Sequence, residues 1–334
     1  MTKLTPSVYI IVLNWNGKDD TLECLASIAA IQYADFETVV VDNGSSDDSV
    51  AAIRAQRPEL HIIETGQNLG FAEGNNVGIK YAMAHHADYI FILNNDTTVD
   101  PLLLQHLVSS AQRHPDAGII GPKTYYHAHP QVIWSAGGYW DNHQCCFEQT
   151  GDGEFDKGQY DTPQPCDFIV GCAMFIPTAV LQKVGTLDAE YFLNYEEVDF
   201  QYRVRAAGYT TLYEPSARIW HKVAASFGGD DSPLKYYFIF RNRLLWARRH
   251  LPIKKRLAVF LSVHIGLFKQ FYRPFFKQAL RKMTPRNLYW AYTSAISNPL
   301  LRARAIGIAD YWKSNFGNCP DHIHQLNKDW KNRT

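Results

Sequence analysis

The stretch "YIFILNNDTTVD", Tyr89 to Asp100, joins an apolar run directly to two amides and one carboxylate. Tyr89 to Leu93 has the length and the residue types of a buried strand. Asn94, Asn95 and Asp96 follow it without a spacer. Asn and Asp are also ordinary turn residues, because their side chains bond to their own backbone. The rest of the chain therefore has to decide between a turn and a ligand site.

Apolar runs alternate with amphipathic segments, which is the pattern of strands and crossover helices in a mainly parallel α/β sheet. The predicted strands are Val8 to Leu13, Thr38 to Val41, His61 to Glu64, Tyr89 to Leu93 and Gly118 to Pro122. The predicted helices are Asp20 to Ala30, Asp48 to Arg57, Glu73 to His85 and Pro101 to His114. Asp100 is the expected N-cap of the last helix, with Pro101 as its first residue. Tyr125 to Gln164 has no clear period, and irregular structure or a small added hairpin is expected there.

Polar clusters follow four of the predicted strands. They are "NWNG" (Asn14 to Gly17), "DNGSSDDS" (Asp42 to Ser49), "GQNLGFAEGNN" (Gly66 to Asn76) and "NND" (Asn94 to Asp96). In open α/β sheets, ligands bind outside the carboxyl ends of the strands. A turn explains each cluster alone, but four clusters at one edge favour a ligand site.

The formal net charge of zero conceals two unequal parts of the 334-residue chain. Residues 1–231 hold 13 Lys and Arg against 30 Asp and Glu, whereas residues 232–309 hold 16 Lys and Arg and no acid. We therefore expect a catalytic domain over 1–231, with halves of about 1–122 and 123–231. A basic, helical C-terminal region over 232–334 follows it, and the charge asymmetry indicates an anionic partner for this region.

Within the basic region, Leu257 to Phe268 is an apolar run of 12 residues with Lys254, Lys255, Arg256 and Lys269 around it. A membrane-spanning helix needs about 20 apolar residues, so this run is predicted not to span. Basic residues mixed with aromatic ones are typical of helices on an anionic bilayer surface. The alternative is a helical subdomain that packs on the catalytic domain or on a second subunit.

The six cysteines show no CxxC pair and no zinc-type spacing with His, and we expect them to be reduced in a cytosolic protein. The N-terminal apolar run is too short for a signal peptide and fits a first strand better, so export is not expected.

Together these motifs resemble the inverting glycosyltransferases of family 2, which have the GT-A nucleotide-sugar-binding fold, and most of all their rhamnosyltransferase-like members. The matching stretches are "VLNWNG", "VVVDNGSSDDS", "NLGFAEGNN", "LNNDTTVD", "DFIVGCAMFIP", "LNYEEVDFQYRVRAAGY" and "IWH". They come in the family's order and cover about Val8 to His221. The resemblance implies a nucleotide-sugar donor, a divalent metal and inversion at the anomeric carbon.

Carried over to this sequence, the resemblance places Trp15 and Asp42 at the nucleobase, with Trp15 stacking and Asp42 accepting a base N–H. It places Asn68 and Gly70, in "NLGFAEGNN", among the residues that bind the nucleotide sugar. Asn95 is expected near the ribose.

The same resemblance makes Asp96 the metal carboxylate and His221, in "RIWHK", the second protein ligand. Hard oxygen ligands suit Mg²⁺ or Mn²⁺, a nitrogen ligand favours Mn²⁺, and the donor's phosphates would supply further ligands. For His221, a core histidine at a strand end is the alternative.

Glu197 takes the position of the catalytic base, where the family usually has Asp. The extra methylene moves the carboxylate by about 1 Å, a distance to which catalytic geometry is sensitive. The alternative is an acidic helix N-terminus that interacts with the helix dipole, and Glu196 is the stronger candidate for that structural role.

The sequence therefore predicts a metal-dependent inverting glycosyltransferase in cell-surface glycan synthesis. It would move L-rhamnose from dTDP-rhamnose, or a sugar from a UDP-sugar, to a lipid-linked or polysaccharide acceptor at the inner face of the membrane. A sugar-nucleotide nucleotidyltransferase is one alternative, although "NWNGKDD" is a poor match to its basic Gly-rich loop. A nucleic-acid-binding protein is the other, but the acidic body would repel that polymer, and no nucleic acid is expected as partner.

Overall fold

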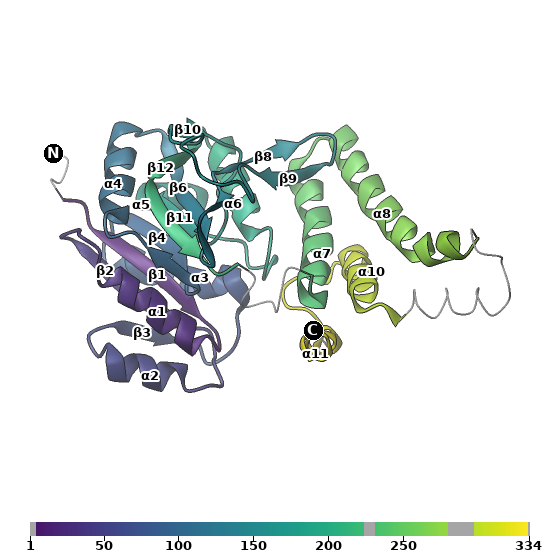
Figure 1. Cartoon of the computed structure of the whole chain (residues 1–334), viewed down its shortest axis with the longest axis horizontal. Coiled ribbons are helices and arrows are strands. Elements are labelled where there is room, and N and C mark those ends of the chain that lie inside the picture. The colour runs from purple at the N-terminus through teal and green to yellow at the C-terminus, as the bar shows by residue number, and fades with distance from the viewer. Residues whose placement is uncertain (1–4, 224–230, 280–296, 333–334) are drawn as a thin grey trace. The chain divides into compact units, whose positions relative to one another are not determined.

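The computed structural model describes residues 5–223, 231–279 and 297–332 (Figure 1). The chain divides into two compact units. Unit 1 comprises Met1–Asp141, Cys146–Phe192 and Glu196–Ala225, and unit 2 comprises Asn142–Cys145, Leu193–Tyr195 and Ser226–Thr334. The division into units does not test whether residues 1–231 are the catalytic domain and residues 232–334 a basic region that binds an anionic partner, so these assignments stay predictions.

Unit 1 is built on a mixed sheet with the strand order β10-β12-β6-β11-β4-β1-β2-β3. Four of these strands run parallel: β1 (Val8–Asn14), β2 (Phe36–Asp42), β3 (His61–Glu64) and β4 (Tyr89–Asn94). Most apolar residues of β1, β2 and β4 are buried on both faces, which explains why these strands appear in the sequence as continuous hydrophobic runs, whereas Ile62 and Ile63 of the edge strand β3 are only partly buried. The register places Asn14 beside Asp42, and Leu13 beside Asn94. The polar residues that end these strands therefore meet at one edge of the sheet.

The other half of the sheet is mixed. Its strands are β5 (Thr97–Val99), β6 (Ala117–Tyr126), β7 (His129–Ser135), β10 (Gln164–Pro165), β11 (Ala173–Pro177) and β12 (Thr210–His221). β11 runs antiparallel to β4 and joins the two halves, while β12 pairs with both β6 and β5. His221 pairs with Thr97, so the end of β12 reaches the residue that follows Asp96. A separate hairpin of β8 (Gly138–Asp141) and β9 (Cys146–Gln149) lies in the stretch where an added hairpin was expected.

Helices cover the sheet of unit 1 (Figure 1). They are α1 (Lys18–Ile28), α2 (Ser49–Gln56), α3 (Gly70–Ala84), α4 (Leu103–Arg113), α5 (Thr178–Val184) and α6 (Glu196–Ala206). The predicted start of α4 was wrong, because the helix begins at Leu103 and not at Pro101. The Asp100 carboxylate accepts a hydrogen bond from the backbone N–H of Leu102 at 2.8 Å. Asp100 therefore closes a turn that precedes the helix.

Unit 2 contains four described helices: α7 (Pro233–His250), α8 (Ile253–Ala279), α10 (Pro299–Trp312) and α11 (Asp321–Lys331). Ser232 and Asn298 cap α7 and α10 with their side chains, and a proline follows each cap, which is a common helix start. The α7 helix packs against α10, and the Tyr237 hydroxyl donates to Asp310 at 2.8 Å. Among the described helices, none has the length and apolar character to cross a membrane. None of the six cysteines, all of which lie among the described residues, forms a disulfide in this structure.

Candidate active site

A chain of side-chain hydrogen bonds connects β2, β1, α1 and the end of β4. Asn14 Nδ2 donates to Asp42 Oδ1 at 2.8 Å. Thr21 Oγ1 lies 2.8 Å from Asn14 Oδ1, and Asn95 Nδ2 donates to Thr21 Oγ1, also at 2.8 Å. Asp42 and Asn95, which the sequence assigned to one nucleotide, therefore belong to one hydrogen-bonded network.

Asp42 and Trp15 differ in their exposure. Asp42 is 3% exposed, and its second oxygen accepts from the backbone N–H of Ser45 at 3.0 Å. Because a carboxylate has about four lone-pair sites, Asp42 retains capacity to accept further hydrogen bonds. Trp15 is 42% exposed, which is unusual for an indole ring and leaves its surface available for stacking.

The structure gives Asn68 and Gly70 positioning contacts. Asn68 Oδ1 accepts from the backbone N–H of Gly70 at 2.8 Å and from Asn43 Nδ2 at 3.1 Å. Gly70 has a φ of +79°, and a Cβ there would lie 2.6 Å from the carbonyl oxygen of Phe192. That carbonyl accepts from the N–H of Phe71 at the start of α3. These residues fix the N-terminus of α3 beside the loop after β2, and their contact with a nucleotide stays a prediction.

Asp96 and His221 form a buried pair, 4% and 6% exposed. Asp96 Oδ1 lies 3.0 Å from His221 Nε2, but neither atom makes a well-directed hydrogen bond with the other or with another described group. His221 Nδ1 also lacks a hydrogen-bond partner among the described residues. Burial raises the pKa of Asp96, but the attraction of His221 and hydrogen bonding from Asn94 outweigh burial, and the pKa lies below its ordinary value. Asp96 is therefore an ionised carboxylate facing an imidazole.

This pair fits a divalent cation. Buried polar atoms normally find a hydrogen-bond partner, and carboxylate oxygen and imidazole nitrogen are both common metal ligands. In the part of the chain that the structure describes, no group of three or more His, Cys, Asp or Glu side chains is arranged to hold a metal. A cation at Asp96 and His221 would thus take its remaining ligands from water or from a bound molecule.

Three acids lie in the first turn of α6, in different surroundings. Asp199 is buried and accepts from the Tyr191 hydroxyl at 3.0 Å and from Arg203 Nε at 2.8 Å. Glu196 is buried too, and its Oε2 has no hydrogen-bond partner among the described residues. Burial, followed by the charges of Glu197 and Asp199, raises the pKa of Glu196 well above its ordinary value. Asp199 is therefore held by hydrogen bonds inside the fold, whereas Glu196 is buried without a partner for Oε2, and the structural role expected for Glu196 stays a prediction.

Glu197 is half-buried and lies over the backbone of Gly171. A Cβ at Gly171 would be 3.3 Å from both Cβ and Cγ of Glu197. The next residue, Cys172, accepts at its carbonyl from the N–H of Asn94 at 2.8 Å. Burial raises the pKa of the Cys172 thiol well above its ordinary value, and the charges of Asp96 and Glu197 raise it further. Both carboxylates act on Cys172, so Glu197 lies at the same edge of the sheet as Asp96.

Sequence reasoning missed Thr21, Gly171 and Lys222. Thr21 joins the two amides of the network, and Gly171 makes room for Glu197. The backbone N–H of Lys222 donates to the Asp96 carbonyl at 3.0 Å and helps to hold that residue. Threonine and glycine carry no chemical signal of their own, whereas the position of Lys222 directly after His221 was a signal that could have been used.

Residues 7–184 match the family described as Glycosyl transferase family 2, which is more than half of the chain. The chain belongs to this family. The resemblance seen in the sequence is confirmed, and a nucleotidyltransferase does not agree with this membership. The match includes Trp15, Asp42 and Asp96 and ends before Glu197 and His221, so the roles of these last two depend on the local structure.

Two relatives of this family 2 glycosyltransferase are named rhamnosyltransferases. The N-acetylglucosaminyl-diphospho-decaprenol L-rhamnosyltransferase of Mycobacterium tuberculosis is 26% identical over 296 residues, which cover 79% of this chain and 93% of that protein. The dTDP-rhamnosyl transferase RfbF of Shigella flexneri is 24% identical over 288 residues, which cover 79% of this chain and 88% of that protein. Both agree with the rhamnosyltransferase-like character of the motifs.

A solved structure confirms the GT-A fold. The mannosyltransferase PcManGT from Pyrobaculum calidifontis, in complex with GDP-Man and Mn²⁺, has a TM-score of 0.56 to this chain. The alignment covers 92% of this chain and 88% of that one at 14% sequence identity. At this identity the likeness concerns the fold alone.

Proposed function

We propose that this glycosyltransferase is metal-dependent and inverting. We propose dTDP-rhamnose as its donor, with a UDP-sugar as the second choice. Its acceptor is a lipid-linked or polysaccharide glycan of the cell surface. The carrying observation is that the Asp42–Asn95 network, the Asp96–His221 pair and Glu197 meet at one edge of the sheet. The names of the two rhamnosyltransferase relatives support rhamnose as the sugar.

The nucleotide lies along the hydrogen-bonded network in this proposal. Trp15 stacks on the base and Asp42 accepts a base N–H, while Asn95 bonds to the ribose. Because the network fixes Asp42 and Asn95 through Asn14 and Thr21, these two side chains lose little conformational freedom when the nucleotide binds. Positioning of the anomeric carbon follows from positioning of the nucleotide.

Asp96 and His221 would hold the divalent cation, and the nitrogen ligand favours Mn²⁺ over Mg²⁺. A cation held there would supply positive charge to stabilise the departing diphosphate. One carboxylate is sufficient, because the diphosphate brings anionic oxygens of its own. Asn94 and Asn95 can bond to the donor without adding repulsion beside the leaving group.

Glu197 accepts the proton of the attacking acceptor hydroxyl. Burial raises the pKa of its neighbour Glu196 and favours the neutral form there, so we assign the negative charge of the pair to Glu197, the less buried member. A base that activates the acceptor on the face opposite to the leaving group produces inversion.

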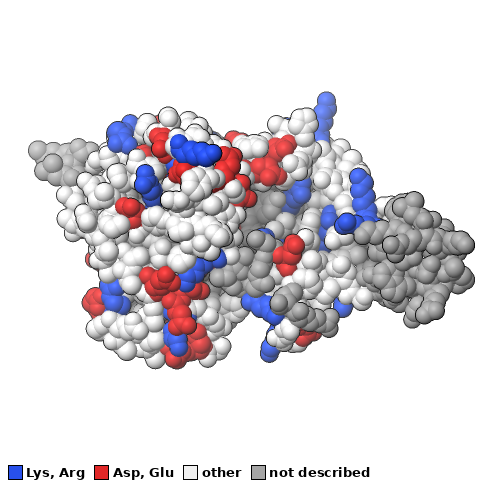
Figure 2. Space-filling view, viewed as in Figure 1, with Lys and Arg blue, Asp and Glu red and all other residues white. Residues whose placement is uncertain are grey.

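We also propose that unit 2 lies on an anionic membrane surface, at the cytoplasmic face where a lipid-linked acceptor would be found. Six side chains of α8 form an apolar stripe with spacings of three or four residues, each between 37% and 61% exposed: Ile253, Leu257, Leu261, Ile265, Phe268 and Tyr272. At 100° per residue, Lys254 lies within this stripe and Lys269 lies along its side, whereas Lys255 and Arg273 lie farther round the helix. On the face shown in Figure 2, acidic side chains gather over unit 1, while the described part of unit 2 carries mainly basic ones.

This combination is typical of an amphipathic helix at an anionic bilayer surface, where each basic residue contributes about 1 kcal/mol. A second copy of the chain would also cover the apolar stripe, but the excess of basic residues around it favours lipid. The residues 280–296, which belong to the acid-free part of the sequence, lie outside the described residues.

Ligand-induced stabilisation tests the donor and the metal together. We expect dTDP-rhamnose with Mn²⁺ to raise the melting temperature, since a ligand at 100 times its dissociation constant adds about 2.7 kcal/mol of stability. UDP-sugars, Mg²⁺ and a chelator are the comparison conditions. A product with the anomeric configuration opposite to that of the donor would establish inversion. If no nucleotide sugar stabilises the protein with either ion, the proposed donor class is wrong.

A further inference from the structure

A cavity in unit 1 opens on the face of β6 and β12 that points away from the Asp96–His221 pair. Trp220 and His221 are consecutive in β12, and consecutive side chains of a strand point to opposite faces of a sheet. The His221 ring lies 4.6 Å from the ring of Trp134, whereas Trp220 stacks on Tyr125 at 5.9 Å. The cavity is therefore separate from the site described above.

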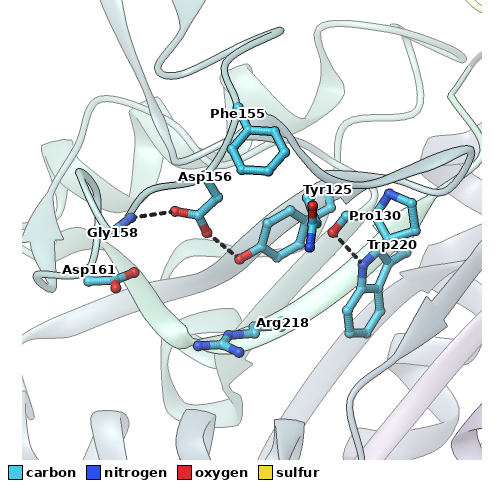
Figure 3. Close-up of a pocket in the computed structure, with 9 residues that line it drawn as sticks. Tyr125, Pro130, Phe155, Asp156, Gly158, Asp161, Arg218 and Trp220 are labelled. Atoms are coloured by element: carbon cyan, nitrogen blue, oxygen red, sulfur yellow. Dashed lines mark hydrogen bonds between the residues drawn. The ribbon is translucent and has the colours of Figure 1, made fainter.

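The cavity has a volume of about 360 Å³, at the lower end of the range for small-molecule sites. Its walls are formed chiefly by Tyr125, Phe155, Asp156, Asp161, Arg218 and Trp220 (Figure 3). Phe155 is 51% exposed, and the indole N–H of Trp220 donates to the carbonyl of Pro130 at 3.2 Å, which fixes the ring. Aromatic surface is thus presented in a polar cavity.

Side chains in the wall of the cavity hold the carboxylates of Asp156 and Asp161. Asp156 accepts from the Tyr125 hydroxyl at 2.6 Å and from Lys123 Nζ at 3.0 Å. Lys123 is completely buried and also pairs with Asp161. A buried charge is tolerated only with such partners, so Lys123 and Tyr125 hold the Asp156 carboxylate in a fixed position, while Asp161 is an exposed side chain that its ion pair with Lys123 keeps at the cavity.

Arg218 supplies the opposite kind of group. It is exposed, and its guanidinium makes no hydrogen bond or ion pair with any other described residue. In the view of Figure 3, Arg218 and Phe155 lie on opposite sides of Tyr125 and Asp156. The cavity therefore combines unused donors, fixed acceptors and an aromatic surface.

The chemistry of these groups selects a ligand class. An anion would be repelled by Asp156 and Asp161, a cation by Arg218 and Lys123, and a purely apolar molecule would leave the charges without partners. A pyranose satisfies all of them, because its hydroxyls donate to carboxylates and accept from a guanidinium while its C–H face packs on an aromatic ring. The volume suits one or two sugar units.

We propose that this cavity binds a neutral sugar unit of the glycan that the enzyme extends, away from the reacting centre. The inference rests on the proposed function in one respect, namely that the acceptor or product is a glycan. A second point of attachment raises the effective concentration of the glycan end at the donor site. Short acceptors that cannot reach the cavity would lose this advantage.

The test uses the full chain with methyl α-L-rhamnoside, methyl β-D-glucoside and N-acetylglucosamine as probes in saturation-transfer NMR, with dTDP and Mn²⁺ present. We expect transfer to at least one probe in the parent protein and its loss in Phe155→Ala and in Arg218→Ala. Tyr139→Ala is the matched control, because Tyr139 is an equally exposed aromatic residue of unit 1 outside the cavity. Both cavity variants change exposed residues, so unchanged melting temperatures are expected.

Binding of dTDP to the same samples separates this inference from the proposed function. Normal dTDP binding with an unchanged sugar signal in both cavity variants would overturn the sugar site while leaving the donor site intact. Absence of any sugar signal in the parent would overturn it as well. Failure of dTDP to bind the parent contradicts the proposed donor class, whatever the sugars do.

Discussion

The strand-end edge of unit 1 and the α8 stripe of unit 2 depart from the usual distribution of side chains in opposite directions. At the edge, Asn14 and Asp42 are polar and almost completely buried, and hydrogen bonds satisfy them. On α8, Leu257 and Leu261 are large, apolar and more than half exposed. Polar residues are seldom fully buried without partners, and apolar stripes seldom stay exposed without a purpose.

The difference agrees with the roles that we propose for the two regions. A buried polar network keeps its geometry, which is what chemistry at one carbon atom requires. An exposed apolar stripe needs only to be covered, and its exact geometry matters less. Substitutions at the edge should therefore change the reaction, whereas substitutions on α8 should change only where the protein resides.

The largest effect is expected from Asp96→Ala. The variant loses the carboxylate of the proposed metal pair, and metal stabilisation of transition-state charge amounts to several kcal/mol, or roughly a 10³- to 10⁴-fold fall in transfer. Calorimetric titration of the donor with and without Mn²⁺ should show that metal-dependent affinity has disappeared. Asp100→Ala is the control, because it removes a carboxylate that only closes the turn before α4. If the metal-dependent donor affinity of Asp96→Ala stays within a few-fold of that of the parent, Asp96 is a turn residue and not a metal ligand.

Next in size is Glu197→Gln, which keeps the shape of the side chain but cannot take a proton. Transfer should fall by about 10²- to 10⁴-fold while the affinity for the donor stays nearly unchanged. Single-turnover rates and donor titration on the same sample separate the two quantities. Glu196→Gln is the neighbouring control and should retain transfer. An exchange of these two outcomes would mean that the base is Glu196.

The sequence predicted the strands best where local hydrophobicity defines them. β3 has the predicted bounds, and β1 and β4 extend only one residue further at the carboxyl end. β6, predicted over Gly118 to Pro122, continues to Tyr126 because its second half pairs with β7 and β12. Those partners are distant in sequence, so no local pattern marks the extension.

The same distinction applies to the candidate site. Parallel strands bring their carboxyl ends together, so the meeting of Asn14, Asp42 and Asn95 followed from the topology. The approach of His221 to Asp96 depends on the pairing of β12 with β5, and this pairing has no local signal in either segment. The resemblance to the family supplied that expectation. Thr21 and Gly171 act through position alone, which only a structure reveals.

A smaller effect, about tenfold or more in membrane affinity, is expected from Leu257→Ser combined with Leu261→Ser. Each loses apolar contact worth about 1.5–3 kcal/mol when buried in lipid. Sedimentation with phosphatidylglycerol vesicles at low salt should decrease, while transfer to a soluble acceptor stays unchanged. Leu102→Ser, at an exposed leucine of unit 1, is the control.

Charge reversal at Lys254 and Lys269 should weaken the same binding and its dependence on salt. Arg248 is less suitable, because its guanidinium stacks on the rings of Tyr311 and Phe316 within unit 2. Equal binding of the parent to neutral vesicles would contradict the electrostatic part of the proposal. A dimer that dissociates on loss of the leucines would assign the stripe to a second copy of the chain.

The smallest effect, on the order of 1 kcal/mol or about 2–4 °C, is expected from Glu196→Gln and should depend on pH. Burial, and then the charges of Glu197 and Asp199, raises the pKa of Glu196 in the folded protein, whereas the unfolded chain has the ordinary value of about 4.3. Below that value both states are protonated and the parent has its full stability. As the pH rises further, the unfolded chain releases the proton first, so the parent loses stability until the pH exceeds the raised pKa. Gln does not titrate, and the advantage of Glu196→Gln in urea unfolding should therefore grow as the pH rises above about 5, towards the raised pKa of Glu196. Glu190→Gln, at an exposed carboxyl, is the control.

Because Glu197 contributes to the raised pKa of Glu196, Glu197→Gln should reduce the pH dependence of the parent's stability. If the advantage of Glu196→Gln over the parent stays constant with pH, Glu196 ionises normally inside the fold.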